Sequence, residues 1–139
     1  MNLNKYTLKA QEAVQKALEL AQAENNQALE PAHVLKALLS DTSNIIHTLM
    51  KKLGANTAGI GKVVDMSISR LPKVEGASVS GQYLSPQLNT ALAKAQKEAT
   101  ALGDQYISSE HVLIGLSQTD GEIATVLKDQ GVTKDNILK

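Results

Sequence analysis

The sequence repeats itself at an offset of 78 residues, and this feature constrains the fold more than any other. Residues 7–39 align with residues 85–117 without a gap, and the identical pairs include His33 with His111. After the next loop one residue is lost, and the match resumes through Gly54 and Gly131. An internal repeat predicts one packing unit used twice. We therefore expect two halves that face each other across a pseudo-twofold axis, with a groove at the seam between them.

Composition limits the classes of protein to consider. The chain has 139 residues, 42% of them apolar, which suits one domain with its own core. Phe and Trp are absent, so the core must be built from Leu, Ile, Val and Ala. The 14 Lys and Arg residues balance 14 Asp and Glu residues, and Arg70 is the only arginine. This balance leaves no basic field for nucleic acid or an anionic membrane, and we expect neither as a partner.

The amino-terminal residues and the lack of cysteine bear on location. Residues 1–8 are polar and lack the apolar centre of a signal peptide. No apolar run approaches the roughly twenty residues that span a bilayer. The chain has no Cys, which excludes disulfides and is compatible with a reducing compartment. We therefore expect a cytoplasmic protein.

Helix signals occur in equivalent places in the two copies. Apolar residues follow a 3.6-residue period from Thr7 to Glu24, with Thr7 as the N-cap. The second copy of this helix begins at Ser85-Pro86 and ends at Gly103. Six further helices are predicted from their caps. In the first copy one runs from Pro31 to Ser40, one starts after Ser43 and ends at Gly54, and one starts after Asn56. In the second copy one starts after Ser108, one starts after Asp120 and ends at Gly131, and one starts after Thr133.

Residues 72–84 separate the copies and have the Pro, Gly and Ser content of a loop, with no alternation typical of a strand. The predicted organisation is one domain over residues 1–139, with a first repeat at 7–71, a linker loop at 72–84 and a second repeat at 85–139. The predicted fold class is all-α, with about eight helices in two four-helix repeats.

Catalytic motifs are not found. The sequence has no Gly-x-Ser-x-Gly elbow, and the serines occupy helix caps and the linker. The segment nearest to a phosphate loop, residues 59–63, lacks the required spacing and hydroxyl. We therefore expect no nucleotide site and no catalytic residue in this chain.

The two equivalent histidines, His33 and His111, are candidate metal ligands. Glu30-x-x-His33 has the spacing of carboxylate-bridged metal bundles, but the second copy has Ser108 in place of the glutamate. Without Cys or a further group of carboxylates, a metal site is not expected. The prediction is instead that His33 and His111 pack on helix first turns with their ring nitrogens satisfied locally, and that His47 is exposed.

A binding module remains. A duplicated helical domain with an apolar seam can accept an apolar segment of another chain. The alternative is that each half buries its own apolar residues and leaves no seam to fill. The residues alone do not decide between the two.

Four stretches resemble the amino-terminal domain of Clp-family AAA+ unfoldases, and the resemblance covers nearly the whole chain. They are TLKAQEAV from Thr7, QALEPAHVLKALL from Gln27, RLPKVEG from Arg70 and GDQYISSEH from Gly103. The RLPKVEG stretch followed by Gln82-Tyr83-Leu84-Ser85 is most similar to the disaggregase branch of that family.

The resemblance implies eight helices in two pseudo-symmetric repeats, tethered to two ATPase modules in a hexameric ring. It implies that ATP and Mg²⁺ are bound in those modules, and that this domain has no cofactor of its own. The implied role is to bind exposed apolar stretches of misfolded or aggregated proteins and help deliver them to the ring. The alternative is docking of a folded adaptor, as in a protease-associated Clp ATPase. We expect the isolated domain to be a monomer.

The resemblance also implies functional polar residues at Thr7, Asp104 and Glu110. For the groove we predict apolar contacts near the start of the second copy, with Asp104 and Glu110 at its rim: Tyr83, Leu84, Leu88 and Leu92. His111 stands where many relatives have an aliphatic residue, so client binding is expected to weaken on acidification, when histidine becomes charged. Affinity is expected to be micromolar or poorer, because a small apolar contact must offset the ordering of a flexible client.

Overall fold

The computed structural model describes residues 3–75 and 81–139, and in these residues the chain forms eight helices and two short strands. The helices are α1 (Leu8–Ala23), α2 (Pro31–Ser40), α3 (Ile45–Leu53), α4 (Thr57–Ser69), α5 (Pro86–Ala101), α6 (Ser109–Ser117), α7 (Glu122–Asp129) and α8 (Lys134–Ile137). The strands are β1 (Ala28–Leu29) and β2 (Tyr83–Leu84). The all-α prediction with two helical repeats is confirmed.

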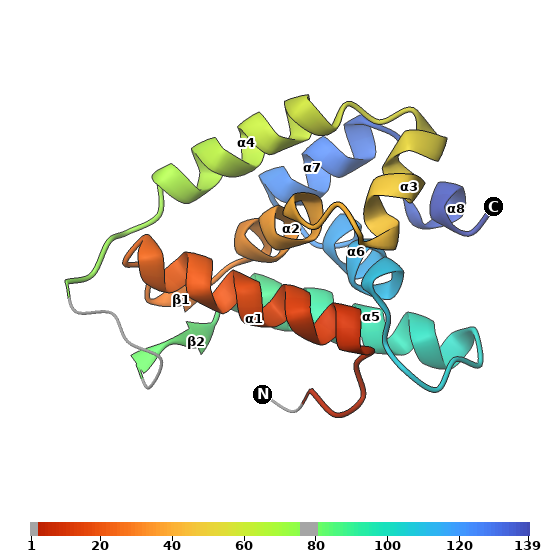
Figure 1. Cartoon of the computed structure of the whole chain (residues 1–139), viewed down its shortest axis with the longest axis horizontal. Coiled ribbons are helices and arrows are strands. Elements are labelled where there is room, and N and C mark those ends of the chain that lie inside the picture. The colour runs from red at the N-terminus through yellow and green to blue at the C-terminus, as the bar shows by residue number, and fades with distance from the viewer. Residues whose placement is uncertain (1–2, 76–80) are drawn as a thin grey trace.

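The two short second helices form the centre of the molecule. Figure 1 shows α2 and α6 between α1 and α5 on one side and α4 and α7 on the other. α1 packs on α2, α5 packs on α6, and α4 contacts both α2 and α7. Seven residues of α2 and eight of α6 are buried. Their nearly continuous apolar sequences explain this position, because a helix that is apolar all round must be covered on every side.

Most helix ends lie where the capping residues predict them. Thr7 Oγ1 accepts from Ala10 N at 3.2 Å, and Ser85 Oγ accepts from Leu88 N at 3.1 Å. The third helix of each repeat, α3 in the first and α7 in the second, begins one residue later than predicted. Asn44 caps α3, because Ser43 is engaged in a turn with Asp41, and Gly121 rather than Asp120 precedes α7.

The matching glycines end the third helices in the same way. Gly54 and Gly131 have φ of 70° and 76°. The residue after each one bonds back to the last turn: Ala55 N donates to Met50 O, and Val132 N donates to Leu127 O. This is the left-handed helix end that glycine adopts without the steric cost of a side chain.

The residues just before each repeat form strand pairs with the other repeat. β2 runs parallel to β1, with Leu84 opposite Leu29, and Tyr6 forms a parallel bridge to Ile107. An offset of 78 converts one pair into the other, so the same contact is made twice. Equivalent backbone hydrogen bonds stabilise the two contacts. Ser85 N donates to Leu29 O at 3.0 Å, and Thr7 N donates to Ile107 O at 2.9 Å.

The prediction of a linker without a strand is therefore wrong at its end, where Tyr83 and Leu84 form β2. A two-residue strand is too short for alternation to reveal it. Residues 76–80 of the predicted linker lie outside the described residues.

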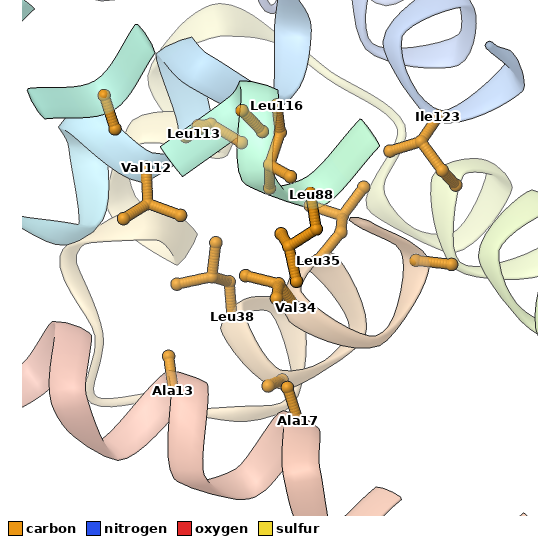
Figure 2. Close-up of a cluster of buried hydrophobic side chains, with 14 of the residues drawn as sticks. Ala13, Ala17, Val34, Leu35, Leu38, Leu88, Val112, Leu113, Leu116 and Ile123 are labelled. Atoms are coloured by element: carbon orange, nitrogen blue, oxygen red, sulfur yellow. The ribbon is translucent and has the colours of Figure 1, made fainter. Parts of the chain in front are cut away.

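One apolar core crosses the seam. In Figure 2, Leu88 from α5 lies against Leu35 from α2, with Leu116 from α6 beside them. These three side chains are fully buried. The alternative in which each half buries only its own apolar residues is therefore wrong. Around Leu88 the predicted groove is filled by side chains of both halves.

Across residues 3–75 and 81–139, none of the helices has both the length and the hydropathy required to cross a bilayer.

Candidate functional site

The connection between α5 and α6 brings the three predicted polar residues to one end of the molecule. Thr7 is held there by the bond from its backbone N to Ile107 O. Its hydroxyl is used as the cap of α1, so Thr7 has a structural role whatever else it does.

Asp104 follows the turn that ends α5. Its backbone N donates to Ala99 O at 2.9 Å, next to Gly103 at φ of 75°. Its side chain is 52% exposed, and Oδ2 lies 2.9 Å from His111 Nε2. Asp104 thus faces solvent on one side and a buried ring on the other.

Glu110 lies in the first turn of α6 and is half-buried. Its Oε1 accepts from Ser108 Oγ at 2.8 Å. A carboxylate in this position is favoured by the helix dipole. In the part of the chain that the structure describes, neither Asp104 nor Glu110 forms an ion pair with a Lys or Arg.

Two exposed apolar residues at this end of the molecule were not predicted from the sequence as site residues. Tyr106, between Asp104 and Glu110, is 51% exposed, and Leu8, next to Thr7, is 76% exposed. Tyr106 could have been found, since it is one of only three tyrosines and lies inside the GDQYISSEH stretch. We call Thr7, Leu8, Asp104, Tyr106 and Glu110 the Glu110 surface.

The two equivalent histidines have equivalent partners. His33 Nδ1 accepts from Glu30 N at 3.0 Å, and His111 Nδ1 accepts from Ser108 N at 2.9 Å. The other ring nitrogen of each lies 2.9 Å from a side-chain oxygen, of Asn26 for His33 and of Asp104 for His111. The prediction that both rings are satisfied locally is confirmed.

Burial affects His33 strongly. Desolvation lowers the pKa of His33 from 6.5 to about 4, opposed by Glu24 and assisted by Lys36. His111 is also buried, at 3% exposure, so it does not line an open groove. The prediction that His47 is exposed is wrong, because it is half-buried and its Nε2 bonds Leu39 O.

The predicted apolar contacts do not form one surface. Leu88 and Leu92 are core residues, with 0% and 7% of their surface exposed, so a client could reach them only if the halves moved apart. Tyr83 is 58% exposed and Leu84 is half-buried. Both lie in β2, which Figure 1 shows at the opposite end of the molecule from the α5–α6 connection. Client contact by these four residues is untested, and the position of β2 means that Tyr83 and Leu84 do not share one surface with Asp104 and Glu110.

A pocket of about 190 Å³ does lie at the seam, though none of the eight predicted site residues lines it. It opens between the start of α2, the end of α4 and the α6–α7 loop, and its lining includes Pro31, Leu71 and Ile123. Beside it, Arg70 Nη2 donates to both carboxylate oxygens of Glu122 at 2.9 Å.

Within the described ranges, no three His, Cys, Asp or Glu side chains are grouped as metal ligands would be.

Comparison with known proteins gives the family. The model of the Clp repeat (R) N-terminal domain matches residues 5–130. The chaperone protein ClpB of Bacteroides thetaiotaomicron is 39% identical over 137 residues, which cover 99% of this chain and 16% of that protein. The chain thus spans about one-sixth of the length of this relative.

Solved structures share the fold. The Hsp104 N-terminal domain from Candida albicans superposes with a TM-score of 0.80 at 25% identity, covering 96% of this chain and 87% of that one. A ClpV N-domain solved in complex with a VipB peptide gives a TM-score of 0.75 at 16% identity, covering 99% of this chain and 87% of that one. The match over most of its length and the shared eight-helix architecture show that the chain belongs to the Clp repeat N-terminal domain family, with ClpB chaperones among its relatives.

Proposed function

We propose that this domain binds exposed apolar stretches of misfolded or aggregated proteins and helps deliver them to the AAA+ ring of a ClpB-like disaggregase. The observation that carries the proposal is the match of 99% of the chain to a ClpB chaperone. In this role the domain is non-catalytic and has no cofactor of its own, and ATP and Mg²⁺ act in the ATPase modules.

The Glu110 surface supplies suitable chemistry for such a client. Tyr106 and Leu8 offer apolar area to a side chain. The carboxylate of Glu110 can accept hydrogen bonds from the backbone N–H groups of an extended segment. Because the accessible apolar area is small, we expect weak binding, on the order of micromolar or poorer.

Binding to one polypeptide in two states tests the proposal. Fluorescently labelled lactalbumin would be titrated with the domain, once in its native form and once reduced and carboxymethylated, so that it stays unfolded. We expect binding of the unfolded form only. Absence of binding to the unfolded form at millimolar domain would contradict the proposal.

A matched pair of variants tests the location. Tyr106→Ala and Tyr83→Ala each remove one exposed tyrosine, from opposite ends of the molecule. Tyr106→Ala should weaken binding of the unfolded lactalbumin, and Tyr83→Ala should leave it unchanged. The reverse result would move the client to the β2 end.

Adaptor docking makes a different prediction in a pull-down from cytosol. The proposed function predicts heterogeneous unfolded clients on the immobilised domain. A single folded protein captured in stoichiometric amount would favour the adaptor instead.

A further inference from the structure

The two copies contain similar histidine arrangements that differ in the N-cap and in the acceptor at Nε2. The N-cap is Glu30 in the first copy and Ser108 in the second, where the Ser108 hydroxyl also lies 2.9 Å from His111 Nδ1. In the first copy the ring faces the amide of Asn26, and in the second it faces the carboxylate of Asp104, at 2.9 Å in both. Asn26 and Asp104 are equivalent at the offset of 78 residues. The molecule therefore holds an internal comparison of a neutral and a charged acceptor in a similar geometry.

The backbone fixes the tautomer of both rings. A backbone N–H can only donate, so the Nδ1 that accepts from Glu30 N or Ser108 N carries no proton. The proton of each neutral ring is then on Nε2, which donates to the Asn26 or Asp104 oxygen. In the first copy the acceptor at Nε2 is the uncharged amide oxygen of Asn26, so this nitrogen is satisfied there without a charge on its acceptor.

In the second copy, the hydrogen bond between His111 and Asp104 joins the two ends of the segment that carries the exposed Tyr106 and Glu110. Asp104 is fixed to the end of α5 through Ala99 O, and His111 lies in the first turn of α6. Tyr106 and Glu110 lie between these two points. The equivalent positions of the first copy are Ala28 and Ala32, so only the second copy presents an aromatic ring and a carboxylate there.

We propose that Asp104 is a positioning residue, which supports client binding through its hydrogen bond to His111 and not through its charge. This inference rests on the proposed function, because it assigns a role within the Glu110 surface. Client contact is then made by Tyr106 and Glu110.

The test compares Asp104→Asn with Asp104→Ala in the full chain, with reduced and carboxymethylated lactalbumin as the probe. Asp104→Asn keeps an acceptor for His111 and reproduces the first copy, so its dissociation constant should equal that of the wild type. Asp104→Ala removes the acceptor, and the dissociation constant should rise roughly three- to tenfold, the range that the loss of one hydrogen bond gives.

A spectroscopic measurement follows the bond itself. Imidazole ¹⁵N resonances of His111 should report the Nε2-protonated tautomer in the wild type and in Asp104→Asn, with a slowly exchanging proton. In Asp104→Ala that proton should exchange fast. Asn26→Ala is the matched control, because it removes the acceptor in the copy that lacks the exposed groups, and it should leave binding unchanged at temperatures where it is folded.

Equal weakening by Asp104→Asn and Asp104→Ala would overturn the inference, because it would show that the charge is required. Wild-type affinity in Asp104→Ala would overturn it as well. If Asp104→Ala does not fold, the comparison of Asp104→Asn with the wild type decides, since unchanged binding supports the inference and lost binding contradicts it. Failure of the wild type to bind the probe would instead contradict the proposed function.

Discussion

At the scale of single residues, the buried His33 makes the stability of the fold sensitive to pH. His33 is fully buried, and its Nδ1 accepts the backbone N–H of Glu30. A proton added to Nδ1 would face the proton of the Glu30 N–H, and this hydrogen bond at the start of α2 would be lost. Burial, which disfavours the charged ring, lowers the pKa of His33 to about 4.

The first prediction concerns stability and pH. The unfolded chain, with a histidine pKa near 6.5, binds a proton in the range where the folded chain does not. Stability from this residue is complete above pH 6.5 and is lost as the pH falls toward 4. Between pH 7 and pH 5 the free energy of unfolding should fall by about 2 kcal/mol. Urea unfolding at a series of pH values measures it.

The control is His33→Gln, which removes the titrating group. The variant should be less stable at pH 7 but should lose less stability between pH 7 and pH 5. A wild type whose urea midpoint does not change across this range would show that His33 is not held neutral.

Glu110 gives the second prediction. It lies in the first turn of α6, where the helix dipole favours a carboxylate, and it accepts a hydrogen bond from Ser108. Glu110→Ala should cost about 0.3–1 kcal/mol of stability and should weaken binding of the reduced and carboxymethylated lactalbumin. A collapse of the fold, seen by circular dichroism, would instead give Glu110 a structural role.

At the scale of elements, the pairs α1–α2 and α5–α6 are built on one plan with different spacing. A Cβ on Gly115 of α6 would collide with the carbonyl oxygen of Ala91 and lie 3.1 Å from Ala95 N, both in α5. The equivalent residue in α2 is Ala37, which faces α1. The second pair therefore approaches more closely, and Gly115 permits it.

The third prediction follows from this difference. Gly115→Ala should destabilise the domain by about 1–3 kcal/mol, because the added methyl overpacks the interface, despite the better helix propensity of alanine. The change Ala37→Gly at the equivalent buried residue should cost about 1–2 kcal/mol, through lower helix propensity and the loss of a buried methyl group. Thermal unfolding of both variants measures this, and a stabilised Gly115→Ala would show that the helices can separate without cost.

Helices were predictable from the sequence because their signals are local. Caps such as Thr7 and Ser85 and the left-handed glycines Gly54 and Gly131 act within one turn, and they are where the sequence predicts them. The strand pairing was not predictable, because Tyr83 and Leu84 have no alternation and pair with residues far away in the chain.

The site was predictable only in part, for a related reason. Polar residues of one short stretch, Asp104 and Glu110, stay together in any fold that keeps the stretch intact. Whether Leu88 faces solvent or the core depends on how the two halves pack, and a helix pattern does not contain that information. Figure 2 shows that it faces the core.

At the scale of the whole molecule, the two repeats are one folding unit. The residues just before each repeat pair with the other repeat, and the apolar core is continuous across the seam. Separation of the halves would expose this core, so unfolding should be a single cooperative transition.

The fourth prediction tests that core. Leu35 is fully buried against residues of both halves. Leu35→Ala should therefore cost about 2–5 kcal/mol. The control Leu138→Ala, at a residue that is 43% exposed, should change stability by no more than about 0.5 kcal/mol. Equal urea midpoints for the two variants would contradict the shared core.

The Glu110 surface is expected to bind unfolded polypeptide, and this is the point on which the proposed function depends. A ¹H–¹⁵N chemical-shift map of the domain, titrated with reduced and carboxymethylated lactalbumin, tests it most directly. The account predicts that shifts cluster on Thr7, Leu8 and the 104–110 segment and leave β1 and β2 unchanged. A titration without shifts, or with shifts centred on the β2 end, would contradict it.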